Sequence, residues 1–315
     1  MKSKSNSTSA CSNAGLAFVC KASLRTCACF FVFAALASAQ HKDFDSPEGW
    51  AMKRFASATL LTGLQPPESA EDRRFGSLTI GFEMGWLPAL DAGQARVGFS
   101  GSKVEDLNKS PIFARPVVRV GLPAKFTGIF AFAAPIRVWD VAPTLAAFGL
   151  ERPLVERGPW TIGWRGYGQV GHANSSFTCP QRALAFPPGS AGNPAGCVAF
   201  SDDTATLRYI GTEGQVSYRI PRWPKLTLHA TAGVNHIQGR FQVNSQRVKG
   251  LDHTRLWTGG ETFSTTGGAS YTLTKRAALT VDTFYTPLWV VRETNGPRTN
   301  DGLFNVRAML SYRLR

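Results

Sequence analysis

The stretch FNVRAMLSYRLR, residues 304–315, alternates between apolar and polar side chains almost without interruption. One face of an extended chain would carry Phe304, Val306, Ala308, Leu310, Tyr312 and Leu314, and the other Asn305, Arg307, Ser311, Arg313 and Arg315, with Met309 as the exception. A period of two residues is the pleat of a β-strand. Three arginines on one face suit water or a water-filled lumen better than a protein core. We therefore predict a strand that separates an apolar medium from a polar one.

Nine further segments upstream have the same period, which predicts an all-β chain of ten antiparallel strands. They cover residues 78–84, 115–122, 126–136, 145–150, 160–169, 213–220, 226–235, 263–273 and 279–285. The 31 glycines and 19 prolines favour turns over long helices. Since no internal repeat is evident, a propeller or a solenoid is not expected.

The predicted connections alternate in length along the chain. Short links cover residues 121–124, 221–224 and 274–276, and long ones cover 88–111, 173–206, 238–260 and 292–302, with a short link near 137–142 where a long one is due. Consecutive connections of an antiparallel barrel lie at opposite ends, so all the long ones should gather at one end. An even number of strands fits this alternation.

The first 39 residues are typical of an export signal. Lys2, Lys4, Lys21 and Arg25 form a basic region, and residues 27–36 form an apolar core. Ala37-Ser38-Ala39 is an A-x-A cleavage site, which predicts a mature chain that starts at Gln40.

Cysteine usage agrees with export. Cys11, Cys20, Cys27 and Cys29 lie in the leader, so two of the six cysteines remain in the mature chain. Cys179 and Cys197 flank a stretch rich in proline and glycine. We predict a disulfide in an external loop rather than a metal site.

Residues 40–75 differ from the strand-like remainder of the chain. Ser46-Pro47 predicts a helix start, with serine as the cap and proline at the first helical position, and Pro66-Pro67 predicts the stop. We expect a short helical segment on the periplasmic side, tucked into the barrel mouth as a plug or lying beneath it. An inserted helix would present Lys53 and Arg54 to lumen acids. A disordered tether, and a strand over residues 54–62, are the alternatives.

The charge balance argues for particular surroundings. The mature chain carries 31 basic residues against 21 acidic ones. No helix-turn-helix, zinc ligand set or aromatic RNA motif is present, so nucleic acid is not an expected partner. An arginine-lined lumen or an anionic lipopolysaccharide surface explains the excess better.

The leader, the alternating strands, the unequal connections and the C-terminal strand together resemble the small bacterial outer-membrane β-barrel proteins. The resemblance covers residues 76–315 and implies an antiparallel transmembrane β-barrel of ten to twelve strands. It implies short periplasmic turns, long external loops and a location in the bacterial outer membrane. The partners that it implies are outer-membrane lipid, lipopolysaccharide and the barrel-assembly machinery.

The polar faces of the predicted strands would line the lumen. The lumen-lining candidates are Glu83, Arg115, Arg119, Arg165, Glu213, Arg219, His229, Asp282, Arg307 and Arg313. In a narrow barrel such residues form salt bridges that fill the interior, whereas in a wider one they line a pore that favours anions. We expect a mostly filled lumen, and hence a structural barrel or a passive conduit for small solutes.

Two other functional classes stay open. A lipid-acting outer-membrane hydrolase would use His229, with Asn235 six residues on and Ser217 and Ser270 on neighbouring strands. A soluble secreted β protein would bury the apolar faces in a core instead. No spacing is diagnostic of catalysis, so no catalytic residue, metal or cofactor is assigned.

Overall fold

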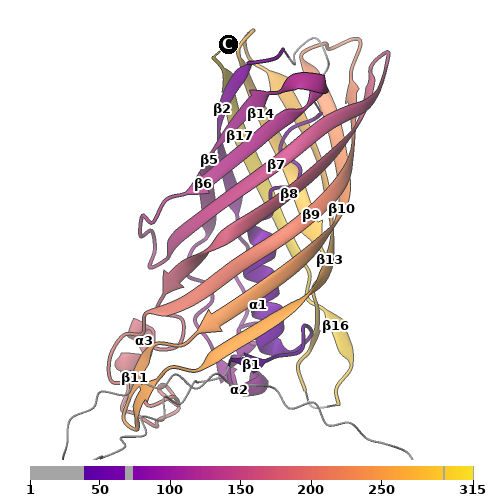
Figure 1. Cartoon of the computed structure of the whole chain (residues 1–315). Helices are drawn as coiled ribbons and strands as arrows, with labels where there is room; N and C mark the ends of the chain where they lie inside the picture. The colour runs from indigo at the N-terminus through magenta and orange to yellow at the C-terminus, as the bar shows by residue number, and fades with distance from the viewer. Residues whose placement is uncertain (1–38, 68–73, 294, 315) are drawn as a thin grey trace, which may run out of the picture. The chain divides into compact units, whose positions relative to one another are not determined.

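Ten antiparallel strands form one closed sheet, as the sequence predicts. The computed structural model describes residues 39–67, 74–293 and 295–314 of the chain. The barrel strands are β2 (Leu78–Trp86), β5 (Ile112–Gly121), β6 (Thr127–Ala133), β7 (Ala142–Arg157), β8 (Trp160–Ser175), β9 (Asp203–Arg219), β10 (Leu226–Gln242), β13 (Arg255–Thr272), β14 (Ala277–Thr286) and β17 (Leu303–Arg313). Each pairs with its neighbours in chain order, β17 pairs with β2, and the barrel is thereby closed (Figure 1).

The two faces of the wall follow the predicted alternation. In β17, Phe304, Leu310 and Tyr312 point outward and are exposed, whereas Asn305 and Arg307 point inward and are buried. The same pattern gives the barrel an apolar outer surface and a largely polar interior. Met309, the exception in the sequence, points inward.

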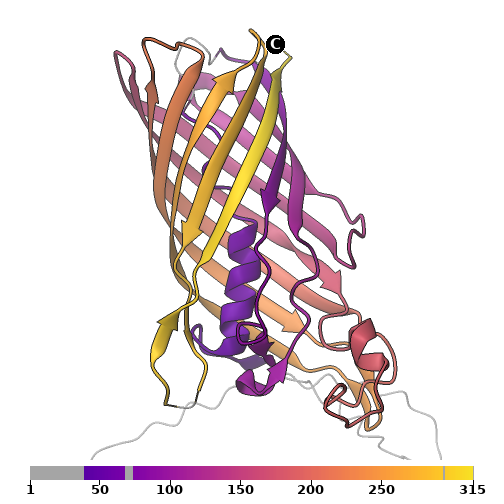
Figure 2. The same ribbon diagram turned by 180° about the vertical axis from the view of Figure 1, so that it is seen from behind.

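The connections fall into two groups at opposite ends of the barrel. Links 122–126, with the 3-10 turn η1 (Pro123–Lys125), 158–159, 220–225 and 273–276 define the short-turn end. The other five links define the long-loop end; they contain β3 (Arg96–Val97), α2 (Gly98–Gly101), β4 (Lys103–Val104), α3 (Gln181–Leu184), β11 (Ser245–Arg247), β12 (Gly250–Asp252), β15 (Trp289–Val291) and β16 (Arg298–Asn300). The C-terminus lies at the short-turn end, at the top of Figures 1 and 2.

Five neighbouring strands are much longer than the sequence predicts. β7, β8, β9, β10 and β13 contain 16 to 18 residues, whereas about 9–11 residues suffice to cross a bilayer. In β8, β9, β10 and β13 the extra residues extend the wall toward the long-loop end (Figure 1).

The polarity of the two faces changes within these long strands. The prediction ends β10 at residue 235, but the strand continues to Gln242. Beyond Asn235 the outward side chains become polar, as at His236 and Arg240, and Ile237 points inward and is fully buried. The two consecutive polar residues at 235–236 break the phase of the alternation, which is why the prediction ends there.

Helix α1 (Pro47–Ala58) starts where the sequence predicts. The Ser46 hydroxyl accepts a hydrogen bond from the Gly49 amide at 3.1 Å, and Pro47 occupies the first turn. The helix ends at Ala58 rather than at Pro66-Pro67, and Thr59 caps its last turn. In the part of the chain that the structure describes, no helix is long and apolar enough to cross a membrane.

Helix α1 lies inside the barrel, in its lower half in Figures 1 and 2. The sequence analysis expects this helix on the periplasmic side, which is the short-turn end of the barrel. The helix packs at the long-loop end instead. The reason is the apolar inner face of the long strands. Trp50 and Ala56 are fully buried in one core cluster with Leu207 and Ile237 of β9 and β10.

Residues 59–67 continue through the lumen as an extended segment with one sharp turn. Gly63 and Leu64 both have positive φ, of 64° and 60°. A side chain at residue 63 would collide with Asp282 and Thr266 on the wall, so glycine fits both the backbone and the space. Residues 39–67 are called the N-terminal segment below.

Candidate functional site: the barrel lumen

The charged side chains of the lumen pair with one another across neighbouring strands. Arg115 of β5 lies directly opposite Glu83 of β2, with Nε 2.8 Å from Oε2. Arg307 of β17 lies opposite Asp282 of β14, with Nε 3.3 Å from Oδ1. All four side chains are almost fully buried, so each charge requires its partner.

Arg165 is the centre of a larger network. It lies on β8, opposite Glu151 of β7 on one side and Glu213 of β9 on the other. Its guanidinium contacts the two carboxylates at 2.9 and 3.0 Å. Arg119 also pairs with Glu151. Four arginines thus meet four carboxylates, and the buried wall carries no net charge from these groups.

The wall donates hydrogen bonds to the backbone of the N-terminal segment. The Thr59 carbonyl accepts from Arg115 Nη1 and from the Tyr209 hydroxyl, both at 2.9 Å. The Gly63 carbonyl accepts from Arg165 Nη1 at 2.8 Å. The Leu60 carbonyl accepts from Arg307 at 3.2 Å. Three of the wall arginines therefore bind both a carboxylate and a peptide carbonyl.

The wall also accepts hydrogen bonds from the segment. The Leu64 amide donates to Asp282 Oδ2 at 2.6 Å, and the Leu61 amide donates to the Tyr209 hydroxyl at 2.9 Å. The Thr62 hydroxyl donates to Glu213. Because the wall satisfies both carbonyls and amides of this backbone, the lumen is chemically a binding site for peptide, and it is occupied by this chain's own residues.

One small cavity lies beside this segment. A cavity of about 20 Å³ lies between Leu61, Arg165 and Met309, which is room for about one water molecule. Met309 faces this apolar part of the segment, and this explains why an apolar residue occupies an inward position in β17.

The lumen-lining candidates occupy two kinds of position. Eight are buried inside the barrel: Glu83, Arg115, Arg119, Arg165, Glu213, His229, Asp282 and Arg307. Arg219 is exposed and Arg313 half-buried, because each ends its strand at the short-turn end. Sequence reasoning missed Glu151, since the prediction ended that strand at residue 150. The inward period from Leu145 through Ala147 and Gly149 would have reached it.

The expected partners of Lys53 and Arg54 are wrong. Lys53 Nζ contacts Asp45 at 3.1 Å and the Trp289 carbonyl at 2.8 Å, and Arg54 donates to the Pro88 carbonyl at 2.8 Å. Both groups therefore bind loop residues at the long-loop end. The reason is that the helix lies at that end, away from Glu83 and Asp282.

His229 has no partner that would orient it for catalysis. Its ring is buried, and neither ring nitrogen has a hydrogen-bond partner among the described residues. Ser217 lies opposite it on β9 without a hydrogen bond to the ring. Asn235 accepts from Tyr167 and donates to Ser264 instead. A hydrolytic triad is therefore not assembled around His229.

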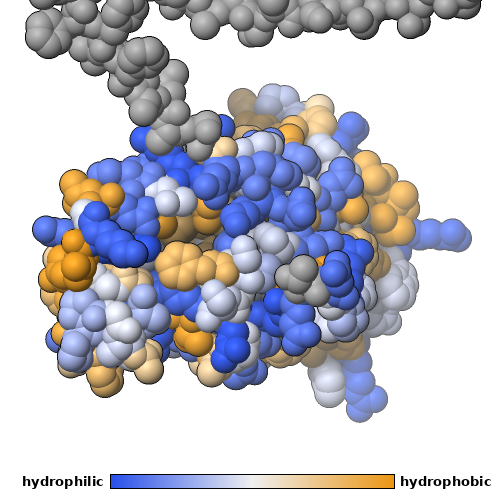
Figure 3. All heavy atoms as spheres, turned by 90° about the horizontal axis from the view of Figure 1, so that it is seen from below, coloured by the Kyte–Doolittle hydropathy of each residue, from blue (hydrophilic) through white to orange (hydrophobic). Residues whose placement is uncertain are grey.

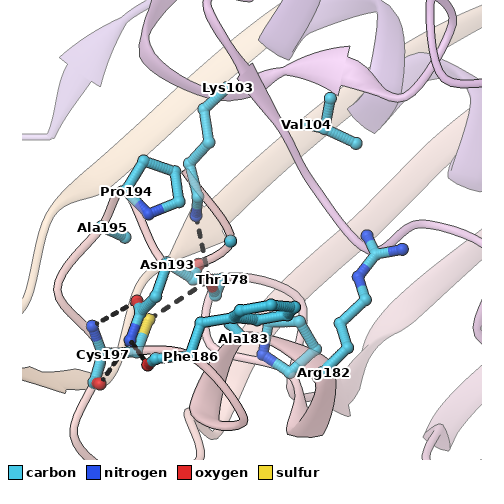
Figure 4. Close-up of a pocket in the computed structure, with 12 residues that line it drawn as sticks. Lys103, Val104, Thr178, Arg182, Ala183, Phe186, Asn193, Pro194, Ala195 and Cys197 are labelled. Carbon is cyan, nitrogen blue, oxygen red and sulfur yellow. Dashed lines mark hydrogen bonds between the residues drawn. The ribbon is translucent and has the colours of Figure 1, made fainter. Parts of the chain in front are cut away.

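The loops at the long-loop end contain the predicted disulfide and a surface pocket. Cys179 and Cys197 are bonded, which confirms the pairing. A pocket of about 230 Å³ lies beside them, between this loop and Lys103 of β4 (Figure 4). Lys103 Nζ contacts Glu105 at 2.8 Å. Burial raises the pKa of Glu105, and the charge of Lys103 offsets part of that effect. The second basic side chain of the pocket, Arg182, contacts Asp106 at 3.7 Å. Both basic groups are therefore paired, so the pocket is not a ready anion site.

Metal ligation has no candidate within the described residues: no group of three or more His, Cys, Asp or Glu side chains could hold an ion. Seen from the long-loop end, the visible face of the barrel is largely hydrophilic, with scattered apolar patches (Figure 3).

The closed strand pairing and the apolar outer surface together define the fold of an outer-membrane β-barrel, and the resemblance to that class is confirmed. Solved structures with this likeness include outer membrane protease OmpT from Escherichia coli, which has 9% identity, a TM-score of 0.35, and coverage of 76% of this chain and 94% of that one. The toluene transporter TodX from Pseudomonas putida has 9% identity, a TM-score of 0.32, and coverage of 84% and 97%.

A third is Ail, the attachment invasion locus protein of Yersinia pestis, with 11% identity, a TM-score of 0.26, and coverage of 76% of this chain and 100% of that one. No family model matches the chain, and no curated protein matches it in sequence.

Proposed function

We propose that this chain is a structural barrel of the bacterial outer membrane whose lumen is closed by its own N-terminal segment. The leader is removed after Ala39, and the short turns and the C-terminus face the periplasm. The outer surface contacts membrane lipid and lipopolysaccharide, and the assembly machinery inserts the barrel. The observation that carries this proposal is the N-terminal segment, hydrogen-bonded to the wall on both sides of its backbone.

The apolar belt supports a membrane location over a soluble secreted protein. Phe130, Ile210 and Leu310 point outward and are 58%, 64% and 54% exposed. They belong to a belt that runs around the closed sheet, where soluble proteins rarely expose contiguous apolar surface of this extent. Lipid is the environment that such a surface fits.

A resting channel is less well supported than a closed barrel. Carbonyls of the N-terminal segment accept hydrogen bonds from three of the wall arginines that a permeating anion would need. The same arginines are paired with carboxylates, so these groups give the lumen no excess positive charge that would favour anions. A conduit for small solutes is the second candidate, and it requires that the segment move.

Fractionation tests the proposed location. We expect the mature chain in the outer-membrane fraction, with a change in gel migration when the folded barrel is boiled. A secreted chain that stays soluble without detergent would contradict the membrane proposal. The leader-cleavage site is read from the N-terminal sequence of the same sample, which should begin at Gln40.

A further inference from the structure

The N-terminal segment crosses the whole lumen in one direction. At its start, contacts are with loops of the long-loop end: Trp50 Nε1 donates to the Asp301 carbonyl at 3.1 Å, and the Ser100 amide donates to Glu48 at 2.8 Å. These contacts place the beginning of α1 at that end.

The middle of the segment then moves along β8 toward the short-turn end. Thr59 bonds to Gln169 at 2.8 Å, Gly63 to Arg165 at 2.8 Å, and Pro67 lies beside Gly163. These three β8 residues follow one another down the strand, which starts at Trp160 beside a short turn. After residues 68–73, Gly76 donates to the Gly121 carbonyl at 2.9 Å, at the short-turn end.

The upstream end of the segment is attached to the rim of the barrel. β14 pairs with β13 from Thr265 onward, which leaves the earlier part of β13 without β14 beside it. β1 (Gln40–His41) pairs there in parallel with Leu256 and Trp257. The Lys42 amide donates to the Trp257 carbonyl at 2.9 Å. This pairing covers part of an otherwise open strand edge.

The β15–β16 hairpin contacts the N-terminal segment on the side opposite β13. The Val291 amide of β15 donates to the Asp45 carbonyl at 2.8 Å, and Arg298 of β16 contacts the Asp45 carboxylate at 2.9 Å. Burial increases along the chain from exposed His41 to buried Pro47. The segment therefore enters the lumen between β13 and the β15–β16 hairpin, beyond the apolar belt.

We infer that the barrel presents its own N-terminal end on the outer surface of the cell, with the lumen as the passage that this segment occupies. The inference rests on the proposed membrane location and orientation: if the short turns face the periplasm, the long-loop end and residue 40 face outward. The wall arginines and Asp282 then bind the backbone of the N-terminal segment, which runs through the lumen from the outer to the periplasmic end of the barrel. Sequence attached at residue 40 would be displayed to the medium.

Cysteine accessibility on intact cells tests this inference. Full-length variants carry one added cysteine at Asp43→Cys in the segment, Lys249→Cys in a long loop, or Lys275→Cys in a short turn; all three side chains replaced are exposed. The probe is a membrane-impermeant maleimide, and the native cysteines 179 and 197 are bonded to each other. We expect Asp43→Cys and Lys249→Cys to be labelled equally on intact cells, and Lys275→Cys to be labelled after permeabilisation.

Each other result overturns the inference in a distinguishable way. If Lys249→Cys is labelled on intact cells while Asp43→Cys requires permeabilisation, the orientation stands and the display of the N-terminal end is wrong. If Lys275→Cys alone is labelled on intact cells, the orientation is reversed. If no position is labelled until the cells are broken, the surface location itself fails.

Discussion

Deleting residues 42–67 should convert a silent barrel into a conducting one. In planar bilayers, the refolded mature chain is expected to give no stable current steps, because residues 59–67 fill the lumen. The deletion variant should give them, since it vacates a path as wide as an extended peptide. Ion selectivity should be weak, because four wall arginines face four wall carboxylates.

The barrel should survive this deletion. The pairs Arg115–Glu83 and Arg307–Asp282 lie within the wall, as does the network around Arg165, so none of these lumen arginines loses its carboxylate with the segment. A matched control removes residues 187–194 from the disulfide-bonded loop at the long-loop end, which lie outside the lumen, and should stay silent. Equal conductance of the full chain and the deletion variant would show that the segment does not close the barrel.

Arg165→Ala should cause the largest loss of stability of any single substitution in the wall. It leaves Glu151 without one of its two arginines, and it removes the guanidinium that contacts Glu213 and the Gly63 carbonyl. Removing one partner of a buried ionic network costs about 3–5 kcal/mol, because uncompensated charges stay buried. Unfolding by urea in detergent micelles measures the change.

Arg222→Ala is the matched control for Arg165→Ala. Arg222 lies exposed in the short link between β9 and β10, and substitutions at such positions usually change stability by less than about 0.5 kcal/mol. If the two variants unfold at the same urea concentration, the lumen network contributes little to stability, and the importance assigned to Arg165 is wrong.

The strands that cross the apolar belt could be predicted because each has an apolar environment on its outer face and a polar one on its inner face. Lipid outside and polar groups inside impose a period of two, and Phe304 through Leu314 display it without help from any other part of the chain. Arg165 and Glu213 were recognisable as inward residues for the same reason. Their pairing follows from the strand register, which a period alone does not specify.

The long strands could not be followed to their ends because their surroundings change along their length. Between the belt and the long-loop end, the outer face of β10 carries polar side chains and its inner face packs against helix α1, so His236 and Ile237 reverse the roles of Val234 and Asn235. A prediction that assumes apolar residues outward and polar residues inward along the whole strand therefore ends the strand at that reversal.

The N-terminal segment was the least predictable part of the site. Ser46-Pro47 marks the helix start through local hydrogen bonding, and that prediction is correct. The segment beyond Ala58 binds the wall mainly through backbone carbonyls and amides, which every residue possesses. No side-chain pattern could therefore indicate that Thr59, Gly63 and Leu64 meet Arg115, Arg165 and Asp282.

The most direct test of the closed lumen is a disulfide between the segment and the wall. The hydroxyls of Thr62 and Thr231 lie 3.5 Å apart, so cysteines there are within reach of a bond after a small rotation. In folded Thr62→Cys/Thr231→Cys protein we expect spontaneous oxidation, read as resistance to alkylation and the loss of two hydrogens in intact mass. Thr62→Cys/Ala230→Cys is the control, because Ala230 points outward; its thiols should alkylate. Full alkylation of both pairs in the folded barrel would contradict a segment seated in the lumen.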